Sequence, residues 1–519
     1  MENKSTERNP HATEFTLTPE QVHGARVKFY EKNNVIELSS DFTMPDYMPE
    51  IRKMLGIYPK LSPISRYIGN GIEFSGRIDY DMVYVTADGE LASAPLGEDF
   101  SFSVHPDYPP EVDKNGEIDA TADIRTESVF IRVTAPRKVN VKCRLNTMTH
   151  VYGTDIANTS LTREKNTEKL LSQINTTSIY RALSDIVELS DEINLPSSSQ
   201  KPINSRGNVI IGEVTNEGNR LNCRGELIID NIFQNSETGE PETIVRKLPF
   251  SQDIDLPRSP SGQLEAFSVS GICGELTLTE AEDKYILDTE LLLEADLAYS
   301  CKSEIAEDLF IPGESCDVTY RNMKYQSLQK QGNTAKTVSV SIPLPDLSLT
   351  EDSLIFDTCA SIKSTDLAND GKELSCTMKI NVLAKNQTDI TSGEASVPIT
   401  MPLGVDMTDG KLSVMARPTV KNARCRIENG NAICEAEITI SYILLAECNK
   451  KIAQELTVSA NAKVPDSGIT VYYPQKGETL WSVAKKFSTT LSELASANDL
   501  TTFDAKDDVS IKHFLKIYC

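Results

Sequence analysis

Residues 470–500 read TVYYPQKGETLWSVAKKFSTTLSELASANDL, and this stretch carries the clearest local structure signals in the chain. The apolar residues that recur at positions i, i+3, i+4 and i+7 are Leu480, Val483, Ala484 and Phe487. This spacing predicts a short helix with one apolar face. Thr479 stands directly before the helix and is predicted to cap its N-terminus.

A second short helix follows the first. Thr490 and Glu493 form a capping-box pattern, in which each side chain bonds to the backbone of the other residue. Leu494 and Ala495 extend its apolar face, and Asn498 suits a left-handed helix end. A strand is predicted before Gly477, and residues 514–517 are predicted to supply a second strand. The predicted local fold is therefore two helices against a two-stranded sheet.

This arrangement resembles a LysM domain, a small module best known for binding N-acetylglucosamine chains. The resemblance implies a shallow groove between the loop after the first strand and the loop after the second helix. One wall of this groove is predicted to contain Gly477, Glu478, Thr479 and Leu480, and the other Asn498, Asp499, Leu500 and Thr501. Trp481, the only tryptophan, is interpreted as a core residue in preference to a ligand platform.

One segment departs from the LysM pattern. LysM domains usually have a compact turn with a Pro-Gly signal before the last strand, whereas this chain carries the longer, charged segment 502–513. A loop of this kind beside the groove would alter or cover a sugar site. Such a loop suits the binding of a protein surface at least as well as the binding of a sugar.

The region ahead of residue 464 contains related segments. The segment VIELSSDFTMP at residues 35–45 reappears as IVELSDEINLP at 186–196, with the leucine and the final proline at the same separation. Residues 72–78 match 221–227 and, more weakly, 374–380. Late in each unit, residues 143–145, 289–291 and 436–438 also correspond. These segments alternate apolar and polar residues, which predicts half-buried strands in three related units.

The predicted fold is mainly β, with tandem antiparallel sandwich or open-barrel repeats followed by a small α+β domain in the order βααβ. Asp88-Gly89 and Asn429-Gly430 are hairpin signals. A linker helix is predicted between the first two units, with Leu170, Leu171 and Ile174 on one face. The predicted divisions are an N-terminal extension (1–30), unit 1 (31–160), the linker helix (161–184), unit 2 (185–300), a degenerate unit 3 (301–463) and the LysM domain (464–519).

The repeated units resemble the SPOCS family of clostridial spore-coat proteins. The matching marks are residues 38–51, Gly76-Arg77-Ile78 with Tyr84-Val85, and residues 136–139. With the LysM domain, the resemblance covers nearly the whole chain. It implies a spore-coat morphogenetic protein in the mother-cell cytoplasm, at the forespore surface, whose partner is a SpoIVA-like coat-assembly ATPase.

The overall charge limits the kinds of partner. The formal net charge of -24 provides no basic surface for nucleic acid. The N-terminus lacks the apolar core of a secretory signal, and no segment has the apolar length of a transmembrane span. We therefore expect an intracellular protein that binds no nucleic acid.

The sequence carries no pattern typical of a catalytic or metal-binding site. The eleven cysteines include no C-x-x-C pair, and we expect reduced thiols that pack as small apolar groups, for example at Cys434. The five histidines lack zinc-protease spacing, and no glycine-rich phosphate loop precedes a helix. We predict no catalytic residue, metal or cofactor, and no enzymatic activity.

Two functions remain open. The first is a non-enzymatic adaptor whose LysM groove docks the coat ATPase. The second is an anchoring protein that binds peptidoglycan or a chitin-type glycan. A wall hydrolase is a third, weaker interpretation, because it would need a pair of carboxylates that the sequence does not mark.

Overall fold

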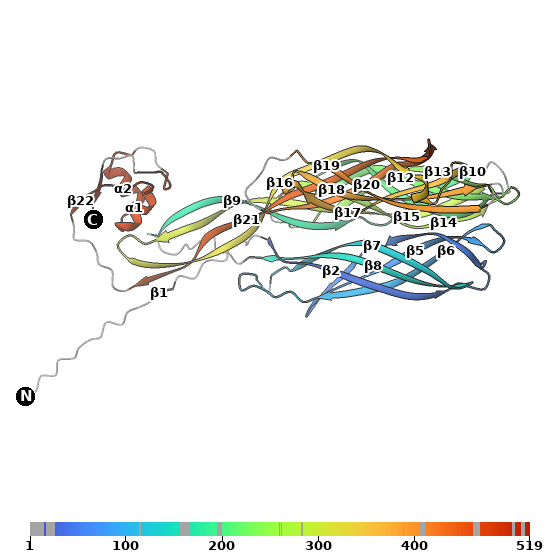
Figure 1. Cartoon of the computed structure of the whole chain (residues 1–519). Coiled ribbons are helices and arrows are strands. Elements are labelled where there is room, and N and C mark those ends of the chain that lie inside the picture. The colour runs from blue at the N-terminus through green and yellow to red at the C-terminus, as the bar shows by residue number, and fades with distance from the viewer. Residues whose placement is uncertain are drawn as a thin grey trace, which may run out of the picture.

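The computed structural model describes most of the chain. The described residues are 15–16, 26–113, 116–155, 167–194, 200–258, 260, 262–281, 284–387, 389–404, 411–459, 468–500, 504–509 and 514–518. Long antiparallel strands make up nearly all of this structure, and its two α-helices lie together at one end of an elongated molecule (Figure 1). The prediction of a mainly β chain with a small C-terminal α+β domain is confirmed.

Residues 26–155 form the first sandwich of two sheets. One sheet has the order β2-β8-β7, and in the other β5 lies between β6 on one side and β3 and β4 on the other. The strands are β2 (Arg26–Thr43), β3 (Ile51–Leu61), β4 (Ser65–Ile68), β5 (Ile72–Thr86), β6 (Leu91–Val104), β7 (Asp119–Ala135) and β8 (Lys138–Thr154).

Residues 168–310 form the second sandwich with the same plan. Its sheets have the orders β10-β15-β14, with β9 also on β15, and β11-β12-β13. The strands are β9 (Glu168–Leu183), β10 (Val187–Asn194), β11 (Gln200–Asn216), β12 (Arg220–Asn235), β13 (Pro241–Asp255), β14 (Gln263–Ala281) and β15 (Lys284–Phe310). The long β15 crosses the predicted boundary between residues 300 and 301.

Residues 315–459 form the third sandwich, with β21 between β16 and β20 in one sheet and β17-β18-β19 in the other. β1 pairs with the last residues of β21 on the side opposite β16, which is the side that β20 occupies farther along β21. The elements are β1 (Phe15–Thr16), β16 (Ser315–Pro343), η1 (Leu344–Leu347), β17 (Ser353–Ala368), η2 (Asn369–Gly371), β18 (Glu373–Asn386), β19 (Asp389–Pro402), β20 (Lys411–Glu428) and β21 (Asn431–Ser459).

The strand register aligns the repeated sequence segments in space. Leu38 lies opposite Cys143 in the first sandwich, and Leu189 lies opposite Thr289 in the second. These four residues are the landmarks that correspond in the sequence. In the third sandwich, Val338 of β16 lies opposite Ala436, so β16 supplies the opening strand that the sequence comparison missed.

The repeated glycine is explained by an aromatic ring on the neighbouring strand. Gly225 lies opposite Phe250, and a Cβ at Gly225 would stand 2.7 Å from the ring. Gly76 lies opposite Phe100 in the same way, with a Cβ distance of 3.0 Å. A Cβ would stand closer still to other atoms, 2.1 Å from the carbonyl oxygen of Ile210 at Gly225 and 2.7 Å from the Ile64 side chain at Gly76. The ring and these neighbours together leave no room for a side chain without movement.

The predicted linker helix is wrong over the residues that the structure describes. Residues 168–183 form β9, which pairs with β15 from Glu294 to Phe310. Ile174 is buried, whereas Leu171 is 43% exposed, so the apolar residues do not share one face as a helix would require. β-branched residues such as Ile174 and Thr176 favour a strand once a partner strand is present.

One expectation about the cysteines is also wrong. Cys425 and Cys434 form a disulfide between β20 and β21, where they lie directly opposite each other. The predicted Asn429-Gly430 turn brings them together, and both turn residues have positive φ (49° and 75°). The eight other cysteines in the described part of the chain are free thiols.

The three sandwiches pack against one another, and an arm extends from them. Buried residues of all three sandwiches, including Tyr152, Ile179 and Ile443, form one apolar cluster between them. The ends of β9, β15, β16 and β21 extend past the cores of the second and third sandwiches. We call these strand ends and the turn between them, residues 168–174, 303–323 and 451–459, the arm. Its interior holds Ile174, Ile305, Leu309, Met323, Ile452 and Leu456. The arm joins the three sandwiches to the C-terminal helices (Figure 1).

The helices in the described part of the chain are short. None of them is long and apolar enough to cross a bilayer.

Candidate functional site

The C-terminal domain has the predicted βααβ fold. Its elements are β22 (Ile469–Tyr472), α1 (Leu480–Lys486), α2 (Leu491–Ala497) and β23 (Leu515–Tyr518), and β22 pairs antiparallel with β23. Both predicted caps form. The hydroxyl of Thr479 accepts from the backbone N–H of Ser482 at 3.2 Å, and that of Thr490 accepts from the N–H of Glu493 at 3.1 Å.

Hydrogen bonds from other residues of the LysM domain hold the first predicted wall of the groove in place. The Glu478 carboxylate accepts hydrogen bonds from the Tyr472 hydroxyl at 2.8 Å and from the Gln475 N–H at 2.7 Å. The backbone hydrogen bond from Gln475 is the main reason that the pKa of Glu478 lies below its usual value. Leu480 is fully buried and cannot contact a ligand. Gly477 is exposed with φ of 85°, and open space surrounds the position of a Cβ.

The charged loop that departs from the LysM pattern pairs with this same wall. The Leu480 N–H donates to the carbonyl of Asp507 at 3.0 Å, and the Trp481 N–H donates to the carbonyl of Ala505 at 2.9 Å. The Val509 N–H donates to the carbonyl of Glu478 at 3.0 Å. Three backbone groups of this wall and its continuation into α1 are therefore paired with residues 505–509.

The second predicted wall is partly structural. The Asn498 side chain donates to the carbonyls of Leu494 and Lys516, both at 2.8 Å, and accepts from the Lys516 N–H at 2.7 Å. It thus fastens the end of α2 to β23. Leu500 is half-buried against the domain core. Thr501 lies outside the described residues.

The left-handed residue at the end of α2 is not the one predicted. Asn498 has φ of −118°, and the next residue, Asp499, has φ of 54°. Asp499 is exposed. The side chain of Asn498 bonds to β23, which holds its backbone in an ordinary conformation and moves the turn by one residue.

Trp481 lies in a core that the LysM domain shares with the arm. Its side chain is 4% exposed and packs edge-on against Phe310 of β15, with the ring centroids 5.0 Å apart. Its indole N–H donates to the carboxylate of Asp308 at 2.8 Å. Leu170 of β9 packs against the same cluster. The interpretation of Trp481 as a core residue agrees with this position.

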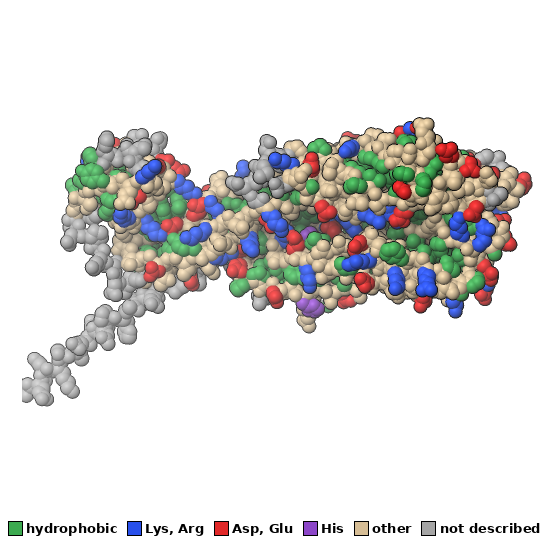
Figure 2. Space-filling view, viewed as in Figure 1, with side chains coloured by type: hydrophobic (Ala, Val, Ile, Leu, Met, Phe, Trp, Pro, Cys, Tyr) green, Lys and Arg blue, Asp and Glu red, His purple; other side chains and the backbone are tan. Residues whose placement is uncertain are grey.

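Charged side chains complete the contact between arm and LysM domain. Lys485 of α1 bonds to Asp308 at 2.6 Å, and Lys506 of the charged loop bonds to Glu307 at 2.9 Å. The Gly313 N–H donates to the carbonyl of Ser488 at 3.0 Å. Figure 2 shows positive and negative side chains interleaved at the left end of the molecule, where the arm lies beside the LysM domain.

The pKa of Asp308 reflects these contacts. Burial by itself raises the pKa of this carboxyl, but hydrogen bonds from Lys485, Tyr320 and Trp481 outweigh it and lower the pKa below its usual value. The carboxylate is therefore ionised whenever the domain is docked near neutral pH. Sequence reasoning missed Asp308 and Glu307 because no local pattern links them to a domain so far along the chain.

Comparison with known proteins identifies the C-terminal domain only. Residues 475–504 match the LysM domain family. No curated protein and no solved structure matches the chain. The match covers both helices and both walls of the predicted groove up to Thr501. The chain therefore carries a LysM domain near its C-terminus.

Proposed function

We propose that the chain is a non-enzymatic adaptor in spore-coat or envelope morphogenesis. In this proposal the β sandwiches are the scaffold, and the LysM domain docks a SpoIVA-like coat-assembly ATPase at the forespore surface, in the mother-cell cytoplasm. The SPOCS-like segments of the sequence support this assignment, since SPOCS units followed by a LysM domain resemble the clostridial spore-coat protein SipL.

The observation that carries the proposal is the pairing of residues 505–509 with the first groove wall. Leu480, Trp481 and Glu478 use backbone groups to bond this loop. A glycan in a shallow groove depends on such backbone groups for orientation and specificity. The surface that remains is formed by exposed acidic side chains such as Asp504, Asp507 and Asp499. Charged side chains of this kind favour a protein partner with a complementary surface.

The contacts that hold the LysM domain on the arm support a scaffold role for the β sandwiches. Asp308, Glu307 and Phe310 of the arm hold α1 and the charged loop through ion pairs and an aromatic contact. A domain held at several points presents its groove in one orientation, which lowers the entropic cost of binding a large partner.

Binding to peptidoglycan or another N-acetylglucosamine polymer is the second candidate. The match of residues 475–504 to the LysM domain family favours it, because a glycan-binding role is what that family supports. In this case the protein would anchor itself to wall material.

The experiment compares both ligands on the full chain with one substitution in the groove. Gly477→Asn adds a side chain where a Cβ meets nothing within 4 Å, and asparagine tolerates positive φ. Gly89→Asn is the matched control, because Gly89 has φ of 88° and equally open space in a distant hairpin. Binding is measured by pull-down of the purified ATPase and by co-sedimentation with purified peptidoglycan.

The adaptor proposal expects the wild-type chain and Gly89→Asn to capture the ATPase and Gly477→Asn to lose it. Capture by Gly477→Asn at the wild-type level would exclude the groove as the docking site. Co-sedimentation of the wild-type chain with peptidoglycan at physiological salt, without capture of the ATPase, would support the second candidate instead.

A further inference from the structure

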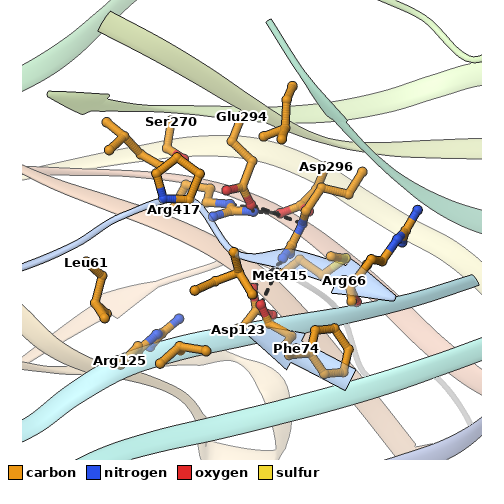
Figure 3. Close-up of a pocket in the computed structure, with 18 of the residues that line it drawn as sticks. Leu61, Arg66, Phe74, Asp123, Arg125, Ser270, Glu294, Asp296, Met415 and Arg417 are labelled. Carbon is orange, nitrogen blue, oxygen red and sulfur yellow. Dashed lines mark hydrogen bonds and ion pairs between the residues drawn. The ribbon is translucent and has the colours of Figure 1, made fainter. Parts of the chain in front are cut away.

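A cavity of about 520 Å³ lies where the three sandwiches meet, far along the chain from the LysM domain. It is lined by β7 of the first sandwich, β14 of the second and β20 of the third (Figure 3). Each of these is an outer strand in its sheet as the described pairing has it.

The three strands contribute equivalent positions to this cavity. Asp123 lies opposite Met148, Ser270 lies opposite Glu294, and Arg417 lies opposite Ser441. Their ladder partners Met148, Glu294 and Ser441 each stand five residues after the matching landmarks Cys143, Thr289 and Ala436. Three structurally equivalent positions therefore lie around the cavity, but their side chains differ. Asp123 is acidic, Ser270 carries a hydroxyl group and Arg417 is basic. The cavity is the place where the repeats have diverged in chemistry.

A network of ion pairs forms one wall of the cavity, and its charged side chains pair with one another. Arg181 of β9 bonds to Asp123 at 2.8 Å and to Asp296 at 2.9 Å. Arg417 bonds to Asp296 at 2.8 Å and to Glu294 at 2.5 Å. These groups connect all three sandwiches, and their mutual pairing leaves them little capacity for a further charged ligand.

Two polar groups beside this network make no hydrogen bond or ion pair within the described part of the chain. The guanidinium of Arg125 makes no hydrogen bond or ion pair with any described residue, although it lines the cavity and is only half-exposed. The hydroxyl of Thr121 is also without a hydrogen bond in the described structure, and Thr121 is 4% exposed. Thr121 is the buried one of the two, and a buried hydroxyl without a hydrogen-bond partner is costly.

Thr121 and Arg125 point to the same side of β7. Residues two apart on a strand share a face, so Thr121, Asp123 and Arg125 lie in one row. The alternate residues Ala120 and Ala122 pack in the core of the first sandwich, so this row lies on the other face of β7, where Asp123 bonds to Arg181. At about 3.3 Å per residue, Thr121 and Arg125 stand about 13 Å apart along the strand.

The remaining walls are mostly apolar. The apolar side chains that line the cavity include Leu61, Ile64, Phe74, Ile272 and Met415. Figure 3 shows Leu61, Phe74 and Met415 around the same space as Arg125. Apolar walls with a few convergent polar groups are typical of sites for small molecules.

We propose that this cavity binds a small amphipathic carboxylate. Arg125 pairs with the carboxylate, since a guanidinium presents two parallel N–H groups to its two oxygens. The apolar body of the ligand lies against Leu61, Ile64 and Met415, and the Thr121 hydroxyl bonds to a polar group farther along it. This site is independent of the adaptor function proposed for the LysM domain.

The test uses the full chain and the fluorescent probe 1-anilinonaphthalene-8-sulfonate, an apolar aromatic anion. Fluorescence titration gives the Kd of the probe, and octanoate is then added as a competing carboxylate. Arg125→Gln is expected to raise the Kd about tenfold or more, the value for loss of one charged hydrogen-bonded contact. Thr121→Val is expected to raise it roughly threefold, for loss of one neutral hydrogen bond.

Two comparisons separate binding from folding. Arg132→Gln is the matched control, because Arg132 lies on the same strand but is exposed and does not line the cavity. Thr121→Val removes a hydroxyl that has no partner, so its melting temperature is expected to stay the same or rise while binding weakens.

Octanoate is expected to displace the probe from the wild-type chain. The proposal is overturned if Arg125→Gln binds the probe like the wild type, if Arg132→Gln loses as much affinity, or if octanoate displaces none of the probe.

Discussion

The carboxylate of Asp308 joins the arm to the LysM domain, and its removal gives the sharpest test of that contact. It accepts hydrogen bonds from Trp481 at 2.8 Å and Lys485 at 2.6 Å, both in the LysM domain, and from Tyr320 of the arm at 2.6 Å. In Asp308→Ala the indole N–H is left buried without an acceptor, and Lys485 loses its ion pair. We expect this substitution to release the domain from the arm.

The loss of docking free energy expected in Asp308→Ala depends on how exposed the hydrogen-bond partners of Asp308 are. The indole hydrogen bond is to a charged acceptor in a buried position and contributes about 2 kcal/mol. Lys485 is 31% exposed, so solvent screening reduces its ion pair to about 1 kcal/mol. The docking equilibrium should therefore shift by about 3 kcal/mol, or roughly a hundredfold. Asp308→Asn keeps an acceptor for the indole and should lose only about 1 kcal/mol.

The assay follows the fluorescence of Trp481, which is the only tryptophan in the chain. Undocking exposes the indole, so Asp308→Ala should shift its emission to longer wavelength and increase its quenching by acrylamide. Asp317→Ala is the matched control, because Asp317 is an exposed carboxylate of the same arm. Unchanged emission and quenching in Asp308→Ala would refute the reasoning that the arm fixes the domain through this residue.

The same contact predicts a pH dependence. The pKa of Asp308 is lower in the docked state than in water, so protonation opposes docking. The contribution of this group is complete above the ordinary carboxyl pKa of about 3.9 and is lost as the pH falls through the lower pKa of the docked state. Trp481 fluorescence should therefore stay constant from pH 8 to about pH 5 and report undocking below about pH 4. A transition near pH 6 would contradict this assignment.

Three further substitutions test the scaffold. Asp296→Ala removes the carboxylate shared by two buried arginines and should cost about 3–5 kcal/mol, seen as a lower melting temperature; a change of less than about 1 kcal/mol would contradict a structural role. Gly225→Ala places a methyl group against the Ile210 carbonyl and the Phe250 ring and should cost about 1–3 kcal/mol by the same measurement, whereas Gly212→Ala, with ordinary contacts, should not. Titration of the denatured, unreduced protein should find two fewer thiols than cysteines, and Cys434→Ser should lower stability by about 2–3 kcal/mol; a full count of thiols would refute the disulfide.

The LysM domain is the part that local sequence patterns predicted best. Thr479 and Thr490 cap the two helices as expected, and residues 515–518 form the second strand. These signals act between residues only a few positions apart, so they are visible without a fold. The groove was predicted less well, because Leu480 points into the core and Asn498 bonds to β23. Spacing alone does not determine which way a side chain near a helix end will face.

The sandwich repeats were predicted from alternation and from recurring landmarks, and the strand register aligns Leu38 and Leu189 as the sequence comparison implied. The opening strand of the third sandwich was missed because its residues have diverged. Residues 168–183 were predicted as a helix because Leu170, Leu171 and Ile174 have helical spacing. Pairing with β15 supplies a full ladder of hydrogen bonds, and this outweighs a weak local preference.

The sequence by itself therefore determined the strands, their turns, the helix caps and the presence of a LysM domain, because each depends on residues close together in the chain. The tertiary structure alone decided the arm, the docking of Trp481 on Asp308, the Cys425–Cys434 disulfide and the cavity beside Arg125. The physical reason is that burial, charge pairing and hydrogen-bond satisfaction depend on neighbours in space. In this protein many of those neighbours lie in another sandwich or domain, 58 to 173 residues away in sequence.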